Sequence, residues 1–369
     1  MFTTLLCLFV TANGAALDLL EVGGQYGTPA ATNATATFWN PAGLAMDTGT
    51  RINLEGAPAF ASVNVNLDGQ GEFWGGDDEY TYFGVAPFVG VATDFGVDNL
   101  GVGLSLNVPY AKGAKALEFG GNGRYHLQQA NITSIFVTGA AAYRIGKLSI
   151  GASGSLVRSS WGAISTTQTL SSLNDNLQSN GLTTDYSDDD IYNPRYSTTL
   201  DFDRLTDTTF TFSTGLYFAP TDRIGVSASY LHGGRFNHSG DLGLSFSCPP
   251  EDDVIGSFGA SLTGTCYAEM TGQGSVGYRF PWRTNLGIRW MPTGRPDHFA
   301  IELMGAYIHW SDFSDYAIST DVDPNTVDLD DESAREATAA TVSQNRLWAR
   351  DAQNTFWVGL DVKRRIAND

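Results

Sequence analysis

Several segments of this chain alternate strictly between apolar residues and small or polar ones, and this alternation limits the fold more than any other feature. Gly101 to Val108 reads GVGLSLNV, in which every second residue is aliphatic. The same period of two recurs over 148–156, 210–218 and 224–230. A period of two is that of a β-strand whose two faces meet different surroundings. The sequence therefore predicts an all-β protein.

The strands are expected to close into a transmembrane barrel rather than to form a secreted β-sandwich or β-helix. In a sandwich the polar face meets solvent, whereas in a lipid-facing barrel the polar and small residues point inward. The alternating segments are about ten residues long, long polar connections alternate with very short ones, and aromatic residues gather near the strand ends, as in outer-membrane barrels. The sequence holds no run of 18 apolar residues, so helical membrane spans are excluded.

Charge and motif content exclude several function classes. The chain has 21 basic and 40 acidic residues, whereas a nucleic-acid partner would require clustered Lys and Arg. The sequence has no Gly-x-Ser-x-Gly elbow and no phosphate loop, and its five histidines show no ligand spacing. Asp321 to Glu332 imitates a calcium loop, but Thr326 stands where that loop needs glycine. We predict no enzymatic activity, no cofactor and no metal site.

Residues 1–16, MFTTLLCLFVTANGAA, are predicted to be a secretory signal peptide, because a short apolar run is followed by small residues. No basic residue precedes the apolar run, so either the start lies upstream or the signal is atypical. Two cysteines then remain, Cys248 and Cys266, in one loop-like stretch. In an oxidising compartment such a pair most simply forms a local disulfide.

The pattern predicts ten strands joined by connections of alternating length. The strands are expected near 51–65, 80–92, 100–109, 125–144, 147–161, 200–219, 222–246, 268–291, 298–313 and 353–363. Long connections, among them 162–199, 247–267 and 314–352, alternate with short ones, which face the periplasm in such barrels. This parity requires 268–291 to be one strand, with Pro281 at a bulge or an unpaired edge position.

Four sequence segments resemble the FadL-type family of outer-membrane transporters for long-chain fatty acids and aromatic hydrocarbons. Asn40 to Ala45 reads NPAGLA and resembles the end of the family's N-terminal hatch. Val108-Pro109-Tyr110 with Gly113, WSDF at 310–313 and WVGLDV at 357–362 follow in the family's order. The resemblance implies an antiparallel up-and-down transmembrane barrel of fourteen strands, with a hatch over 17–49 plugging the lumen and the barrel over 50–369. With about ten strands here, we expect the chain to be C-terminally incomplete.

The resemblance also suggests where a ligand would pass. In the hatch, Asn40, Pro41 and Ala42 match the family motif, and Asn107, Pro109 and Tyr110 stand at the end of the third strand, beside which ligand is expected to leave sideways. Capture is expected in the outer loops, where Val254, Ile255, Phe258 and Leu262 lie between the two cysteines. The alternative is that these four residues form a small core of the loop itself.

The alternation places four charged residues on the inward face near the periplasmic end, namely Arg289, Glu302, Asp361 and Lys363. One interpretation is a salt-bridge network among the strands and the hatch. The other makes Arg289 or Lys363 a partner for a fatty-acid carboxylate.

These observations favour a passive transporter of hydrophobic compounds in the outer membrane of a Gram-negative bacterium. It would contact outer-membrane lipid and lipopolysaccharide, and it would depend on the barrel-assembly machinery. Two alternatives are a structural or adhesive barrel that keeps the hatch without transport, and a general porin. A porin should have an eyelet of charges at mid-barrel and no hatch.

Overall fold

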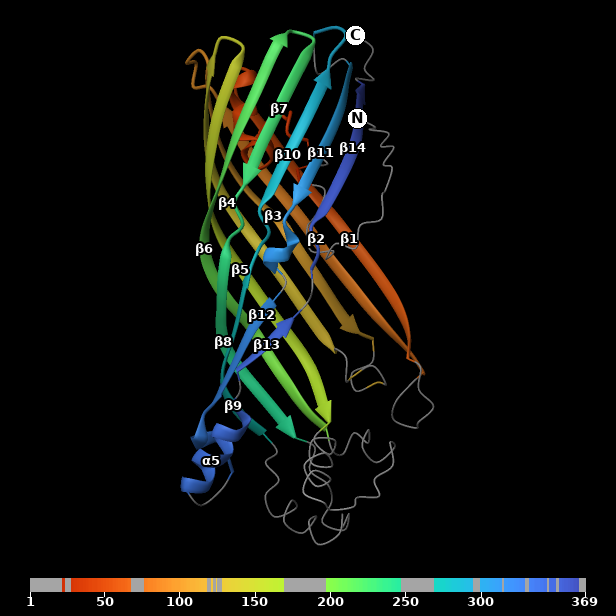
Figure 1. The fold of residues 1–369 in the computed structure, drawn as a ribbon, viewed down its shortest axis with the longest axis vertical. Helices are drawn as coiled ribbons and strands as arrows, with labels where there is room; N and C mark the ends of the chain where they lie inside the picture. Colours follow the sequence, from red (N-terminus) through yellow and green to blue (C-terminus); the bar gives the residue numbers. More distant parts are fainter. Residues whose placement is uncertain are drawn as a thin grey trace.

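The computed structural model describes residues 22–23, 28–67, 76–117, 121, 124, 128–168, 197–246, 269–294, 299–313, 315–328, 332–343, 345–349 and 352–364. Most of these residues belong to one antiparallel sheet that curls into a half-barrel (Figure 1). The predicted all-β class is confirmed. No helix in these ranges is long and apolar enough to cross a bilayer.

Six continuous strands form the first part of the sheet. They are β1 (Arg51–Leu67), β2 (Gly76–Thr93), β3 (Leu100–Ala116), β4 (Gln129–Ile145), β5 (Leu148–Gln168) and β6 (Ser197–Thr221). Each pairs antiparallel with the next along the chain.

The remaining strands form four staves, each one crossing of the sheet, and every one of them is interrupted. The staves are β7 (Ile224–Leu231) with β8 (Arg235–Phe246), β9 (Glu269–Arg279) with β10 (Arg283–Trp290), β11 (Phe299–Ile308) with β12 (Asp315–Val322), and β13 (Asn345–Ala349) with β14 (Thr355–Arg364). From β6 onward, β7, β10, β11 and β14 pair in one row, while β8, β9, β12 and β13 pair in a second row. The interruptions therefore lie side by side across the sheet.

The described sheet thus contains the ten predicted strands, if each interrupted stave counts as one. Pro281 lies in the interruption between β9 and β10, where no ladder hydrogen bond is needed from it. The alternation of connections is also confirmed, because tight turns such as 146–147 and 222–223 share one end of the sheet (Figure 1).

The prediction that residues 314–352 form a long loop is wrong in part. It contains β12, the short helix η5 (Pro324–Thr326), the helix α5 (Glu332–Val342) and β13. This part of the chain is acidic and polar, so its local pattern reads as a solvated loop. Pairing of β12 with β9 supplies the order that local pattern does not show.

The outer face of the sheet changes from apolar to polar along the strands. Leu156 and Phe210 are cross-strand partners and are 57% and 64% exposed. Two residues further from the tight turns, Arg158 is paired with Thr208, and both are exposed. The inner face changes in the opposite sense, from buried serines such as Ser153 to aromatic residues such as Trp161. The sheet therefore has an apolar outer band at its tight-turn end and an extension with a polar outer face.

The interruptions between β7 and β8 and between β9 and β10 help these two staves make the same change. In β7 the odd-numbered residues face inward, whereas in β8 the even-numbered ones do, so that Ser229 and Phe236 are both buried. The same exchange separates β9 from β10. At each of these interruptions the alternation of inward and outward residues shifts by one residue, which moves every following side chain to the opposite face. The shift allows β8 to present apolar residues inward although β7 presents polar ones there.

Candidate functional site

The N-terminal segment (residues 28–46) lies on the inner side of the sheet (Figure 1, red). It contains the short helices α1 (Ala36–Trp39) and η1 (Pro41–Met46), and η1 packs against β3, β4, β5 and β6. Its buried apolar side chains are mostly alanines, which let its backbone approach the wall closely.

Asn40 fixes the turn between the two helices. Its φ of −163° is extended, as expected for a residue before proline. The fully buried amide accepts a hydrogen bond from Ala42 N (3.1 Å) and donates to Pro29 O (2.7 Å) and to Leu216 O on β6 (3.1 Å). The motif residues Asn40, Pro41 and Ala42 thus shape the segment and join it to the wall.

The close approach at Asn40 depends on Gly215 of β6. A Cβ built on Gly215 would lie 1.8 Å from Asn40 Oδ1, a distance that no side chain tolerates. We expect Gly215→Ala to displace the N-terminal segment and to lower the melting temperature by several degrees, since overpacking costs about 1–3 kcal/mol. Thermal unfolding of the purified protein measures this. Gly139→Ala is the matched control, because a Cβ there meets nothing within 4 Å. Equal melting temperatures for the two variants would contradict the expectation.

Hydroxyl groups of the wall hold the rest of the segment. Thr37 Oγ1 lies 2.8 Å from Ser105 Oγ of β3. Ser149 Oγ donates to Ala42 O (2.6 Å), and Ser229 Oγ donates to Trp39 O (2.7 Å). The serines on the inner face of the sheet therefore bind backbone of the N-terminal segment as well as one another.

The carboxylate of Asp94, in the turn between β2 and β3, holds the chain just beyond the segment. Its Oδ2 accepts from Gly49 N (2.7 Å) and its Oδ1 from Gly96 N (2.9 Å). These backbone donors lower the pKa of Asp94 below its ordinary value, because they favour the ionised form.

An ion pair joins the segment to the wall near the tight-turn end. Arg289 and Glu302 are cross-strand partners, and Arg289 Nη2 donates to Glu302 Oε2 at 2.8 Å with both side chains at most 5% exposed. Thr28 Oγ1 lies 2.6 Å from both carboxylate oxygens of Glu302. Asp361, also buried, is the β14 partner of Glu302, and Lys363 pairs with Ala300 in the same ladder. The structure therefore brings Arg289, Glu302 and Asp361 together.

A second buried arginine contacts the last two residues of α1. The guanidinium of Arg283, at the start of β10, lies 5.2 Å from the ring centroid of Phe38 and 4.9 Å from that of Trp39. Arg283 is only 1% exposed. Such a cation over two aromatic faces attracts them strongly when water is excluded.

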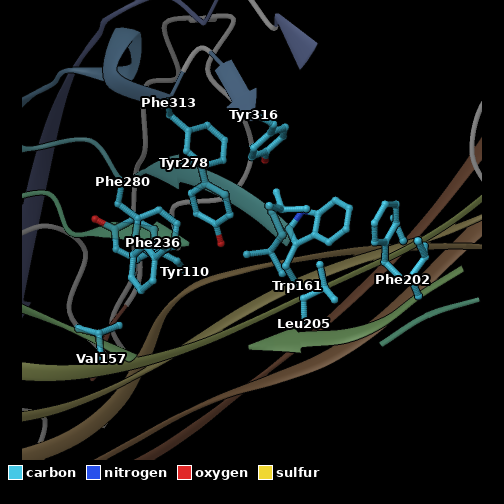
Figure 2. Packing of buried hydrophobic residues seen from close by; sticks show 14 of the residues in the cluster. Tyr110, Val157, Trp161, Phe202, Leu205, Phe236, Tyr278, Phe280, Phe313 and Tyr316 are labelled. Carbon is cyan, nitrogen blue, oxygen red and sulfur yellow. The ribbon is translucent and has the colours of Figure 1, made fainter. Parts of the chain in front are cut away.

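A continuous line of aromatic side chains, here called the aromatic row, runs along the inner side of the sheet, and Figure 2 shows its part from Phe202 to Tyr110. Its members, in spatial order, are Phe202, Trp161, Tyr316, Tyr278, Phe280, Tyr110, Phe136, Phe38 and Trp39. Neighbouring ring centroids lie between 4.3 Å (Tyr110 and Phe280) and 6.5 Å (Trp161 and Tyr316) apart. The row leads from the polar extension of β6 to the N-terminal segment.

The strand pairing between β2 and β3 is interrupted next to this row, and this unpaired stretch is here called the opening. Thr81 pairs with Lys115 and Phe88 with Asn107, and the residues between these pairs are not in register. On the other side, β3 carries one residue more than β4 between Asn107 and Tyr110. Pro109 lies in this bulge, where a residue without an N–H fits. The ring of Tyr82 reaches across to Gly113, where a Cβ would lie 2.4 Å from Tyr82 Cε2.

This geometry corrects one sequence-based expectation. Asn107, Pro109 and Tyr110 do not end the third strand, because β3 continues to Ala116. The extension carries lysines and a glycine in place of the alternating pattern, and its order comes from pairing with β4. The three residues form an internal bulge instead.

Other predicted residues lie outside the described ranges. These are the signal peptide, the first residues of the predicted hatch, the cysteines Cys248 and Cys266, and the loop residues Val254, Ile255, Phe258 and Leu262. Their disulfide and their capture role stay predictions.

Comparison with known proteins identifies the family. Residues 6–354 match the family described as outer membrane protein transport protein (OMPP1/FadL/TodX). The chain belongs to this family. Its members are transport proteins of the outer membrane, and the family is not one of enzymes.

Solved structures share the fold of this OMPP1/FadL/TodX member at low identity. A Pseudomonas aeruginosa FadL homologue is 15% identical with a TM-score of 0.68, covering 91% of this chain and 73% of the homologue. The Ralstonia pickettii toluene transporter TbuX is 14% identical with a TM-score of 0.61, covering 94% and 81%. The P. putida toluene transporter TodX is 14% identical with a TM-score of 0.60, covering 92% and 77%. No curated protein matches the chain.

Sequence reasoning missed Thr28, Arg283 and most of the aromatic row. Thr28 and Arg283 act through partners far away in the chain, which no local pattern shows. Part of the aromatic row could have been predicted from the sequence, because Trp161 and Phe202 occupy inward positions while Arg158 and Arg204 are exposed on the same strands. An alternation whose apolar side changes along a strand marks the end of the apolar outer band.

Proposed function

We propose that this protein is a passive transporter that carries hydrophobic molecules, long-chain fatty acids or related hydrocarbons, across the outer membrane of a Gram-negative bacterium. The observation that carries the proposal is the aromatic row. A buried line of rings on the inner side of a membrane barrel offers an apolar solute contact over its whole length, which a water-filled porin lumen does not.

The apolar outer band would face lipid, and the polar extension would stand outside the membrane. A ligand captured by the outer loops enters the aromatic row at Phe202 and Trp161. It moves along the row to Tyr110 and Phe136, beside the opening between β2 and β3. Release there delivers it sideways into the bilayer, so it never crosses the polar inner face at the tight-turn end.

The N-terminal segment blocks the direct way to the periplasm and acts as the hatch. Ligand arriving at Phe38 and Trp39 shifts the segment enough to clear the path beside β3. We assign Arg289 and Glu302 to anchoring the segment, because each already has the other and Thr28 as partners. This assignment favours the salt-bridge network over a carboxylate site at Arg289.

Uptake by cells tests the proposal. Cells that produce the protein should take up labelled oleate faster than cells without it, and should take up a small sugar no faster. Equal acceleration of the sugar would instead indicate a general porin. No acceleration of either solute, with the protein present in the outer membrane, would indicate a structural or adhesive barrel.

A further inference from the structure

Asn107 is a buried amide at the meeting point of three features. It lies in β3 at the start of the bulge, where β2 and β3 separate. Its cross-strand partner on β4 is Phe136 of the aromatic row. Two residues earlier, Ser105 contacts Thr37 of the N-terminal segment. Asn107 therefore lies where the aromatic row meets one end of the opening.

The amide of Asn107 has no hydrogen-bond partner among the described residues. The side chain is 0% exposed, and both Oδ1 and Nδ2 are without a donor or acceptor in range. Burying such a group unpaired costs about 1–3 kcal/mol. Leucine has the same branched arrangement of side-chain heavy atoms and carries no polar atom, so the apolar rings around this position do not by themselves call for an asparagine.

We propose that Asn107 binds the polar head of an otherwise apolar ligand, a carboxyl or hydroxyl group, as the ligand leaves through the opening between β2 and β3. The inference rests on the proposed transport function and narrows its substrate class. An amide offers both a donor (Nδ2) and an acceptor (Oδ1), which complement a carboxyl or hydroxyl group. An unsubstituted hydrocarbon leaves both atoms unpaired, so the site discriminates against it.

The surroundings suit such a ligand. The rings of Phe136 and Tyr110, which lie 5.8 Å apart, offer the apolar body of the ligand an aromatic surface next to Asn107. The strand opening then receives it. The guanidinium of Arg283 contacts the ring of Phe38, which in turn contacts Phe136. Among the described residues beside the opening, Asn107 offers a buried donor and a buried acceptor that are both unpaired.

The test compares Asn107→Leu with the wild-type protein for two solutes of similar length, labelled oleate and labelled hexadecane, in cells. We expect oleate uptake to fall about tenfold, the effect of losing one or two hydrogen bonds. Hexadecane uptake should stay within about twofold. The purified variant should lose less stability than Asn285→Leu, because the amide that it removes has no hydrogen bond to lose. A purely structural role would instead make the two variants lose stability equally.

Asn285→Leu is the matched control. Asn285 is an equally buried amide on the inner face of β10, but it donates to Ser229 at 3.0 Å and lies away from the opening. Its replacement should lower stability and leave the ratio of oleate to hexadecane uptake unchanged. An unaltered ratio in Asn107→Leu, with both solutes still transported, overturns the inference and leaves the transport function standing. If the wild type transports neither solute, both proposals are wrong.

Discussion

Replacing Glu302 with alanine is expected to lower the free energy of unfolding by about 3–5 kcal/mol. The change leaves the guanidinium of Arg289 buried without its carboxylate, and it removes the acceptor beside Thr28 Oγ1. Removing one partner of a buried pair is costly because the other charge stays in a poorly solvating environment. Urea unfolding of the purified protein in detergent micelles measures the difference.

Two further variants make this result specific. Glu269→Ala makes the same change at an exposed position on β9 and should alter stability by less than about 0.5 kcal/mol. The double variant Arg289→Met with Glu302→Leu removes both charges and should regain most of the lost stability. If Glu302→Ala unfolds like Glu269→Ala, the pair does not hold the N-terminal segment to the wall.

The alternation in the sequence determines much of this fold because a period of two shows directly which residues share a face. It places Arg289 and Glu302 on the inner face, and their register makes them direct partners. It does not show that Thr28, far earlier in the chain, completes the pair. Contacts between the N-terminal segment and the wall depend on how the sheet curls, which no local pattern encodes.

Long strand extensions are the other limit of sequence-based prediction. Residues 162–168 and 197–199 were expected to be loop, yet they pair in β5 and β6. In this extension the apolar Ala163 is buried, and so are the hydroxyl residues Thr166, Ser197 and Thr198, so polarity no longer shows which side of the strand faces inward. Beyond the apolar band, strand order depends on neighbouring strands and on the aromatic side chains that fill the interior.

The beginning of the N-terminal segment and its helix α1 are held by different physical interactions. Thr28 is bound through charge-assisted hydrogen bonds, whereas Phe38 and Trp39 are bound through aromatic contacts and the cation of Arg283. An apolar ligand competes with aromatic contacts and leaves the ion pair intact. We therefore expect α1 to move away from β3 when ligand arrives, while the segment stays bound to the wall at Thr28.

A disulfide between positions 37 and 105 is expected to abolish uptake. The hydroxyl oxygens of Thr37 and Ser105 lie 2.8 Å apart, so cysteines at both positions place their sulfur atoms within reach of each other. In a background with Cys248 and Cys266 replaced by serine, oxidation of Thr37→Cys/Ser105→Cys ties α1 to β3. Oleate uptake should fall to that of cells without the protein, and a reducing agent should restore it.

A second cross-link separates locking of the segment from stiffening of the wall. Thr138 Oγ1 of β4 and Ser155 Oγ of β5 also lie 2.8 Å apart on the inner face, with no part in the N-terminal segment. Oxidised Thr138→Cys/Ser155→Cys should transport oleate like the reduced protein, because β4 and β5 need not separate. Full uptake by the oxidised 37–105 variant, with its disulfide verified by mass spectrometry, would show that ligand passes without any movement of α1 from β3.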